Sequence, residues 1–181
     1  MDPSPLEERA LVTRTGDAVV IGPLADADHD ALFTLFDEIV ESGAGYPHAA
    51  PLTRAVFDAT WVTPVTLTVV ARHHQDGHDE LVGAYYLKPN FPGRAAHIAN
   101  AGYIVDRSQR GGGIGRLLVE DSIRRAPGLG FDAIQFNLVF ASNPARSLYE
   151  ELGWREIGRL PDAVDGEDAV IYWRRVGPTS V

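Results

Sequence analysis

The sequence predicts a single α+β domain with a mixed sheet, because segments of strand character alternate with amphipathic helical segments along its 181 residues. This length suffices for one hydrophobic core, and a composition of 45% hydrophobic and 23% charged residues is ordinary for a globular protein. No repeat or linker interrupts the pattern. We therefore expect one domain over residues 17–176, preceded by a loose arm over residues 1–16 and followed by a tail over residues 177–181.

The domain begins with a strand and two helices. The segment "DAVVIGPL" (17–24) has strand character. Residues 25–43 carry leucine, phenylalanine, isoleucine and valine at helical spacing, with aspartates at the start and a glycine after the end, as is typical of an amphipathic helix. A loop over residues 43–52 leads to a second, shorter helix over residues 53–62.

A hairpin is predicted next. Residues 65–72 and 80–89 are two β-rich segments joined by the polar stretch "RHHQDGHDE". This stretch contains His73, His74 and His78, which allow a metal site as an alternative. Its position between two strands favours a solvated hairpin loop, and we predict no bound metal.

The second half continues the alternation of strands and helices. Glycine-rich turns separate several of these segments, and asparagine and proline precede the last helix. The expected elements are a strand over 95–105, a helix over 114–126, a strand over 128–139, a helix over 143–154, and an antiparallel pair over 155–160 and 168–176.

Charge and composition exclude several classes of protein. The net charge is −9, and no basic run exceeds the pairs Arg124-Arg125 and Arg174-Arg175, which argues against a nucleic-acid-binding protein and leaves room for a neutral or cationic substrate. The chain has no cysteine, so disulfides and thiolate chemistry are excluded. It has no apolar run of membrane-spanning length, and its acidic start is unlike a signal peptide. We expect a cytoplasmic protein without membrane contact.

The stretch "QRGGGIGRLL" (109–118) has four glycines in five residues, more than a turn requires. Phosphate is the expected ligand, because free N–H groups at a helix start attract anions. A P-loop needs Lys and then Ser or Thr after the last glycine, and Arg116-Leu117 stand there instead. A dinucleotide-binding turn needs a glycine at position 116, where this sequence has Arg116. A nicotinamide-dependent oxidoreductase is therefore only a minor alternative. A connection without a ligand is disfavoured by the entropic cost of the glycines.

A third pattern, R-x-x-G-x-G at Arg110, Gly113 and Gly115, resembles the acyl-coenzyme A loop of the GCN5-related N-acetyltransferases (GNAT). Three further features agree with that family in order and spacing: Asn143, Tyr149 and Gly153-Trp154. The resemblance covers roughly residues 80–155. It implies a mostly antiparallel central sheet flanked by helices, with splayed central strands that form the acyl-coenzyme A cleft.

The resemblance also implies a cofactor site. Loop amides would hold the pyrophosphate, arginines would supply local positive charge, and a strand edge would pair with the pantetheine arm. The expected cofactor-binding residues are Ile104, Val105, Arg110, Gly111, Gly112, Gly113, Ile114, Gly115, Arg116 and Asn143.

A closer likeness, in "YYLKPNFPGRAAHIANAGYIV" and "AIQFNLV", is to yeast-type acetyltransferases that act on proline analogues such as azetidine-2-carboxylate. It implies that Asn100 and Asn137 contact the amino-acid substrate, although core asparagines are the alternative for each. Tyr149 would protonate the departing thiolate. Tyr46 and Phe91 are expected to wall the substrate pocket.

The predicted activity is therefore transfer of an acetyl group from acetyl-coenzyme A to the amine of a small molecule, an amino or imino acid, by direct attack in a ternary complex. An acyl-coenzyme A sensor on the same fold is the non-enzymatic alternative. The strands carry no obvious glutamate to deprotonate the amine, and His97 is expected to be a packed or rim residue, so the general base is left open. The resemblance makes a homodimer plausible.

Overall fold

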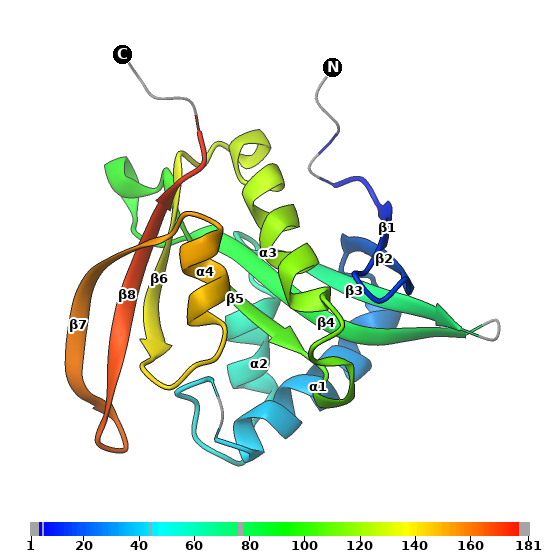
Figure 1. Ribbon diagram of the computed structural model, residues 1–181, viewed down its shortest axis with the longest axis horizontal. Helices are drawn as coiled ribbons and strands as arrows, with labels where there is room; N and C mark the ends of the chain where they lie inside the picture. Colours follow the sequence, from blue (N-terminus) through cyan, green and yellow to red (C-terminus); the bar gives the residue numbers. More distant parts are fainter. Residues whose placement is uncertain (1–3, 5, 44, 76–77, 178–181) are drawn as a thin grey trace.

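The computed structural model describes residues 4, 6–43, 45–75 and 78–177, which form one eight-stranded sheet with helices on both faces (Figure 1). The strand order is β1-β2-β3-β4-β5-β6-β8-β7, and every neighbouring pair is antiparallel except β5 and β6. The strands are β1 (Arg9–Val12), β2 (Ala18–Pro23), β3 (Leu67–Gln75), β4 (His78–Pro89), β5 (Ile98–Val105), β6 (Ala133–Phe140), β7 (Arg155–Val164) and β8 (Glu167–Arg175).

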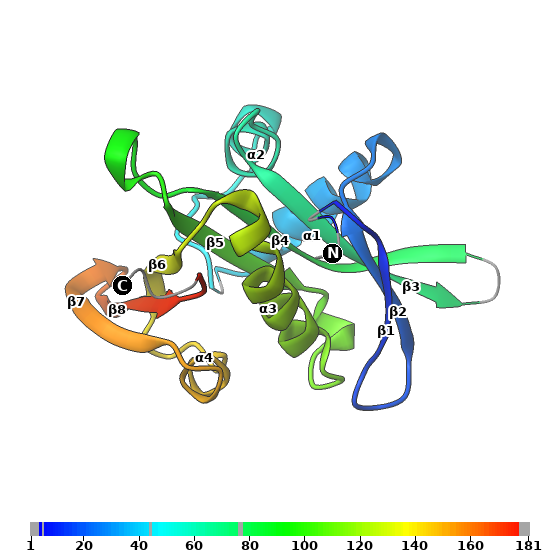
Figure 2. The same ribbon diagram turned by 90° about the horizontal axis from the view of Figure 1, so that it is seen from above.

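Four α-helices cover the sheet, two on each side, within the described residues (Figure 2). Helices α1 (His29–Glu41) and α2 (Arg54–Trp61) lie on one face, and α3 (Ile114–Arg125) and α4 (Arg146–Glu151) lie on the other. Short 3₁₀ turns occur at η1 (Asp26–Asp28), η2 (Gly93–Ala95), η3 (Arg107–Gln109) and η4 (Pro127–Leu129). The predicted α+β architecture is confirmed.

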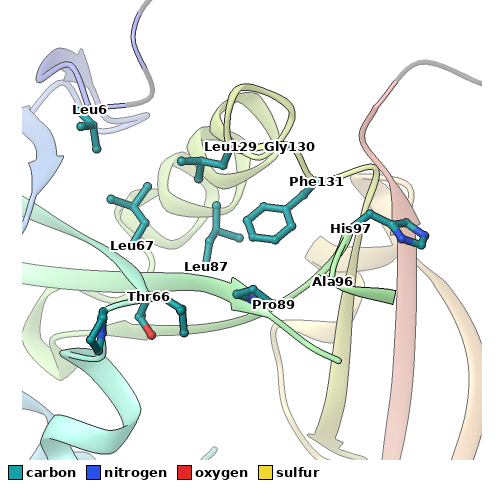
Figure 3. Close-up of a pocket in the computed structure, with 12 residues that line it drawn as sticks. Leu6, Thr66, Leu67, Leu87, Pro89, Ala96, His97, Leu129, Gly130 and Phe131 are labelled. Atoms are coloured by element: carbon teal, nitrogen blue, oxygen red, sulfur yellow. The ribbon is translucent and has the colours of Figure 1, made fainter. Parts of the chain in front are cut away.

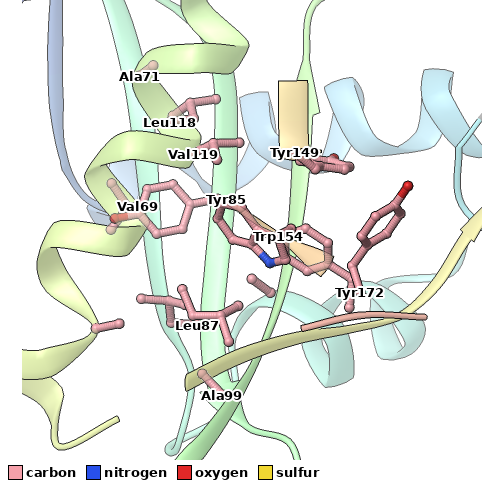
Figure 4. Packing of buried hydrophobic residues seen from close by; sticks show 14 of the residues in the cluster. Val69, Ala71, Tyr85, Leu87, Ala99, Leu118, Val119, Tyr149, Trp154 and Tyr172 are labelled. Carbon is pink, nitrogen blue, oxygen red and sulfur yellow. The ribbon is translucent and has the colours of Figure 1, made fainter. Parts of the chain in front are cut away.

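Each face of the sheet has its own hydrophobic core. On the α1–α2 face, Phe36 packs against Trp61, which in turn packs against Tyr86 of β4. On the other face, Figure 4 shows Tyr149, Trp154 and Tyr172 gathered at the side of the core that α4 covers. Since the side chains of a strand alternate between faces, the apolar run of β4 supplies both cores at once.

The strands β5 and β6 separate along their length. They pair in parallel only over Ile98–Asn100 and Ala133–Gln135, whereas β5 stays paired with β4 as far as Val105. The ladder between β6 and β8 is itself irregular between Phe136 and Val139. The central strands therefore splay beyond Asn100, as the family resemblance implied, and the gap between them positions the candidate site.

The N-terminal arm was predicted wrongly for part of its length. Arg9–Val12 forms the edge strand β1, which pairs with β2. Arg9 lies 3.1 Å from the buried carboxylate of Asp121 on α3, and Leu11 packs against the core. These long-range contacts order a segment whose own four-residue pattern is too short to predict a strand. Of the tail predicted over residues 177–181, only Gly177 lies within the described residues.

The histidine-rich stretch also differs from the prediction. His73 and His74 lie on β3 and His78 on β4, so the hairpin extends through them, and its turn at residues 76 and 77 lies outside the described residues. His74 Nδ1 and Asp79 Oδ1 are 2.7 Å apart, and both side chains are exposed. Across the described part of the chain, no group of three or more metal-ligating side chains is close enough to hold an ion.

Candidate functional site

A cleft of about 630 Å³ opens where β5 and β6 diverge, at the C-terminal end of β5. The end of α1, the start of α3 and the segment from β6 to α4 complete its walls. Six of the predicted residues line this cleft: Ile104, Val105, Arg110, Gly115, Asn143 and Tyr149. Tyr46, predicted to wall the substrate pocket, lies there too.

The glycine-rich loop connects η3 to α3. Gly111 and Gly113 have φ values of 83° and 106°, which L side chains rarely adopt, and Gly113 is the N-cap of α3. A Cβ on Gly111 would meet nothing within 4 Å, so the main chain is open there. The loop therefore presents unshielded backbone at a helix N-terminus, where the amides and the helix dipole attract anions.

The turn between β1 and β2 packs against the other side of this loop. A Cβ on Gly113 would lie 3.3 Å from the backbone nitrogen of Arg14, and the hydroxyl of Thr15 donates to the Gly112 carbonyl at 3.4 Å. Gly112 and Gly113 thus also serve close packing within the protein. The sequence analysis missed this contact because it joins residues about a hundred positions apart.

The predicted arginines divide into two kinds. Arg110 lines the cleft, whereas Arg116 is engaged at the surface with Glu151 (2.6 Å) and Glu120 (3.4 Å) and does not line it. The Ile114 side chain is buried in the core, so only the backbone of this first residue of α3 is left to contact a ligand. Arg110 therefore carries the positive charge in the cleft wall.

A second cavity, of about 170 Å³, adjoins the cleft deeper in the splay between β5 and β6. The loop after α1 covers it with Tyr46 and His48, and the two strands contribute Asn100 and Asn137. Among the residues that the structure describes, five line both cavities: Gly45, Tyr46, Tyr103, Asn143 and Tyr149. The two spaces share one wall, on which the predicted residues Tyr46 and Tyr149 lie, whereas Asn100 and Asn137 line the smaller cavity alone.

The two asparagines are brought to the same cavity but already have protein partners. Asn100 donates to the Gln135 carbonyl at 3.1 Å and accepts from the Tyr86 hydroxyl at 3.1 Å. Asn137 exchanges two hydrogen bonds with Asn90, at 3.0 and 2.6 Å. A carboxamide has two N–H groups and two lone pairs on its oxygen, so Asn100 has one N–H and one lone pair left for a ligand.

Tyr149 faces both cavities from α4. Its ring packs 4.8 Å from that of Phe136, and only 7% of the residue is exposed. Burial raises the pKa of the Tyr149 hydroxyl above its ordinary value, and nearby Tyr172 adds to this effect. The phenol is therefore protonated at neutral pH and can donate a proton or a hydrogen bond.

Asn143 shapes the segment that leads into α4. Its side-chain oxygen accepts a hydrogen bond from the Ala145 backbone nitrogen at 2.9 Å. The helix itself begins only at Arg146, three residues later than the start predicted from the sequence. Asn143 thus helps to place Tyr149 at the shared wall.

Two other residues considered from the sequence lie elsewhere. Phe91, predicted to wall the substrate pocket, is 40% exposed and lines neither cavity. His97 borders a separate groove of about 590 Å³ at the end of the sheet where β5 begins (Figure 3). That groove is lined mainly by apolar side chains such as Leu87, Leu129 and Phe131. The described residues that line it bring no cluster of reactive side chains together.

Comparison with known proteins identifies the family. The model of the acetyltransferase (GNAT) family matches residues 32–154. The chain belongs to the GNAT family. Its match with the N-acetyltransferase aca1 of Schizosaccharomyces pombe is 45% identical over 89 residues, which are 49% of this chain and 43% of that protein. Its match with the protein SPT10 of Saccharomyces cerevisiae is 39% identical over 85 residues, 46% of this chain and 13% of that protein. The matches thus span less than half the length of these curated relatives.

Solved GNAT structures share the whole fold. A GCN5-related N-acetyltransferase from Kribbella flavida is 34% identical, with a TM-score of 0.80 over 87% of this chain and 97% of that one. A phosphinothricin acetyltransferase from Sinorhizobium meliloti, solved in complex with AcCoA, is 20% identical, with a TM-score of 0.75 over 88% of this chain and 89% of that one. The second similarity extends to the fold alone. In the described part of this GNAT protein, no helix has the length and hydrophobicity needed to cross a membrane.

Proposed function

We propose that this GNAT protein transfers the acetyl group of acetyl-coenzyme A to the amine of a small amino or imino acid. The main support for the proposal is the pair of adjoining cavities between the diverging strands β5 and β6, with the Tyr149 phenol in their common wall. The larger cavity suits a long anionic donor and the smaller one a compact acceptor. Reaction between them requires contact across that wall.

The larger cleft supplies what acetyl-coenzyme A needs. The amides at the start of α3 and the Arg110 guanidinium would hold the pyrophosphate. Ile104 and Val105 follow the point where pairing with β6 ends, so their strand edge can bond the amides of the pantetheine arm as a peptide would. The thioester would then lie toward Tyr149 and the smaller cavity.

The smaller cavity favours an amino acid over a polyamine. About 170 Å³ admits only a small molecule, and no aspartate or glutamate lines it among the described residues. A polyamine would place further cations there without a counter-charge. Amide groups suit a zwitterion, since their oxygens accept from an amine and their N–H groups bind a carboxylate. Proline analogues, suggested by the likeness to the yeast-type enzymes, are the first acceptors to test.

The transfer would take place in a ternary complex. The chain has no cysteine to carry an acyl group, which favours direct attack of the amine on the thioester carbonyl. The Tyr149 hydroxyl would donate a hydrogen bond to the departing thiolate and give it its proton.

Two measurements test the proposal. Calorimetric titration with acetyl-coenzyme A should show micromolar binding, and release of free thiol should depend on an added amine. Azetidine-2-carboxylate should support faster release than spermidine. Failure to bind acetyl-coenzyme A would refute the proposal, and binding without turnover on any amine would support an acyl-coenzyme A sensor instead.

A further inference from the structure

We propose that His48 is the general base of this enzyme and accepts the acceptor amine's proton on Nδ1. This inference rests on the acetyltransferase function proposed above. His48 lies in the loop between α1 and α2, and it lines the smaller cavity together with Asn100 and Tyr149. It was not among the residues singled out in the sequence, although Tyr46, two positions earlier, was.

The ring of His48 is held in place by its neighbours. Its centroid lies 5.2 Å from that of Phe36 on α1 and 5.8 Å from that of Tyr46, and Nε2 lies 3.4 Å from the Thr60 hydroxyl on α2. Contacts with both helices leave the imidazole little freedom to turn. A positioned side chain is the first requirement for proton transfer in an active site.

The hydrogen bonds around Thr60 fix the tautomer of His48. The Thr60 hydroxyl has a single proton, which it donates to the Val56 carbonyl at 2.8 Å. Toward His48 the Thr60 oxygen therefore acts as an acceptor, so Nε2 must carry the hydrogen. In the neutral ring Nδ1 then has a lone pair, and this atom is buried without a hydrogen-bond partner among the described residues. Because Nδ1 has almost no accessible surface, an acceptor amine filling the cavity would displace the atoms that now cover Nδ1 and supply that partner.

The charges around the cavity keep His48 in its basic form. Burial, reinforced by the nearby Lys88 cation, lowers the pKa of His48 below its ordinary 6.5. Lys88 itself is half-buried, with Nζ 3.4 Å from the Thr60 carbonyl and 4.7 Å from the centre of the Tyr86 ring. A second cation is disfavoured beside Lys88, so a bound ammonium also loses its proton more readily than in water. The titratable groups that line the cavity with His48 are Tyr46, Tyr86, Tyr103 and Tyr149.

The proton transfers balance over one turnover. The ammonium gives one proton to His48 Nδ1, and the neutral nitrogen attacks the thioester carbonyl carbon. As the C–N bond forms, the C–S bond breaks and the thiolate takes the Tyr149 proton. The nitrogen loses its second proton to the Tyr149 phenolate, and His48 returns its proton to solvent. The products are the acetylated amine, coenzyme A and one proton.

The pH dependence of turnover tests this role. With both substrates saturating, kcat of the unmodified enzyme should be constant above the pKa of His48 and fall as the pH drops through it, below 6.5. His48→Gln keeps a donor for Thr60 but cannot accept the proton. Its kcat at neutral pH should be lower by ~10²–10⁴-fold, and the acid limb should disappear. His74→Gln, at the exposed hairpin, should behave as the unmodified enzyme.

The outcomes separate this inference from the proposed function. If His48→Gln turns over at the unmodified rate, or keeps the acid limb, His48 is not the base, while thiol release would still support the acetyltransferase function. If the unmodified enzyme releases no thiol with any amine, both proposals fall. Thermal melting followed by circular dichroism checks folding, and His48→Asn provides the same readout if the glutamine variant does not fold.

Discussion

Replacing Gly102 with alanine should disturb both cavities through a single added methyl group. Gly102 lies on β5 opposite Tyr86 and close to the Tyr46 hydroxyl. An added Cβ would lie 2.3 Å from the Tyr46 hydroxyl oxygen and 2.7 Å from Cε1 of Tyr86, distances that real Cβ atoms do not show. The φ of Gly102 is not positive, so the backbone itself accepts alanine. The expected effect is therefore steric.

The size of the effect follows from these distances. The Tyr46 hydroxyl would have to move by about 1 Å to regain ordinary van der Waals separation. Overpacking of a well-packed region costs roughly 1–3 kcal/mol. For a chain of this length that cost corresponds to a decrease in Tm of about 2–12 °C. Because Tyr46 lines both cavities, its displacement should raise the KM values for both the donor and the acceptor.

Melting curves and steady-state kinetics together measure these effects. The matched control is Tyr46→Phe, which removes the oxygen responsible for the shortest contact. The double variant should be less destabilised than the sum of the two single variants, because the first substitution relieves part of the clash made by the second. A Gly102→Ala variant with the unmodified Tm and unmodified KM values would refute the packing described here.

Three further predictions concern the residues singled out in the sequence. Gly113→Asp should abolish acetyl-coenzyme A binding, because φ of 106° strains any side chain and the added charge repels phosphate; unmodified affinity in a folded variant would place the cofactor elsewhere. Tyr149→Phe should lower kcat by ~10²–10⁴-fold with cofactor affinity nearly intact, and unchanged turnover with chemistry rate-limiting would make Tyr149 a core residue only. Asn137→Ala should lower kcat/KM for a proline analogue by about five- to more than a hundredfold while cofactor binding persists, with Asn100→Ala at least as harmful. If both folded asparagine variants acetylate the analogue at the unmodified rate, the amino-acid proposal is wrong.

Local patterns in the sequence were sufficient to predict the framework of the site. The glycines at 111 and 113 indicated an open backbone before a helix, and the structure gives both of them a positive φ. The elements themselves follow from short-range geometry, namely helix period, strand alternation and turn chemistry, which a single sequence records directly. Tyr149 and Asn143 were expected from the resemblance to the GNAT family, and both line the cleft.

The remaining features depend on contacts between distant segments. His48 has no distinctive local pattern, and its tautomer is set by Thr60 and Val56 on another element. Phe91 was attractive as an aromatic near the predicted substrate strands, yet its turn lies outside both cavities. The strand at Arg9 depends on the carboxylate of Asp121, more than a hundred residues away. Packing determines such positions, and no local periodicity reports it.

The common wall of the two cavities has a thermodynamic consequence. If the cavities hold the donor and the acceptor as proposed, any movement of Tyr46 or Tyr149 that one ligand causes also alters the space offered to the other. Linkage requires the change in affinity to be the same in both directions. Bound acetyl-coenzyme A therefore changes the affinity for the acceptor by the same factor by which the bound acceptor changes the affinity for acetyl-coenzyme A. Substitutions that shorten side chains of the common wall, in order to widen the smaller cavity for a bulkier amine, would therefore change the affinity for the donor as well. Residues that line only the smaller cavity, such as Ala101 and Leu138, are the places where acceptor preference can be altered independently.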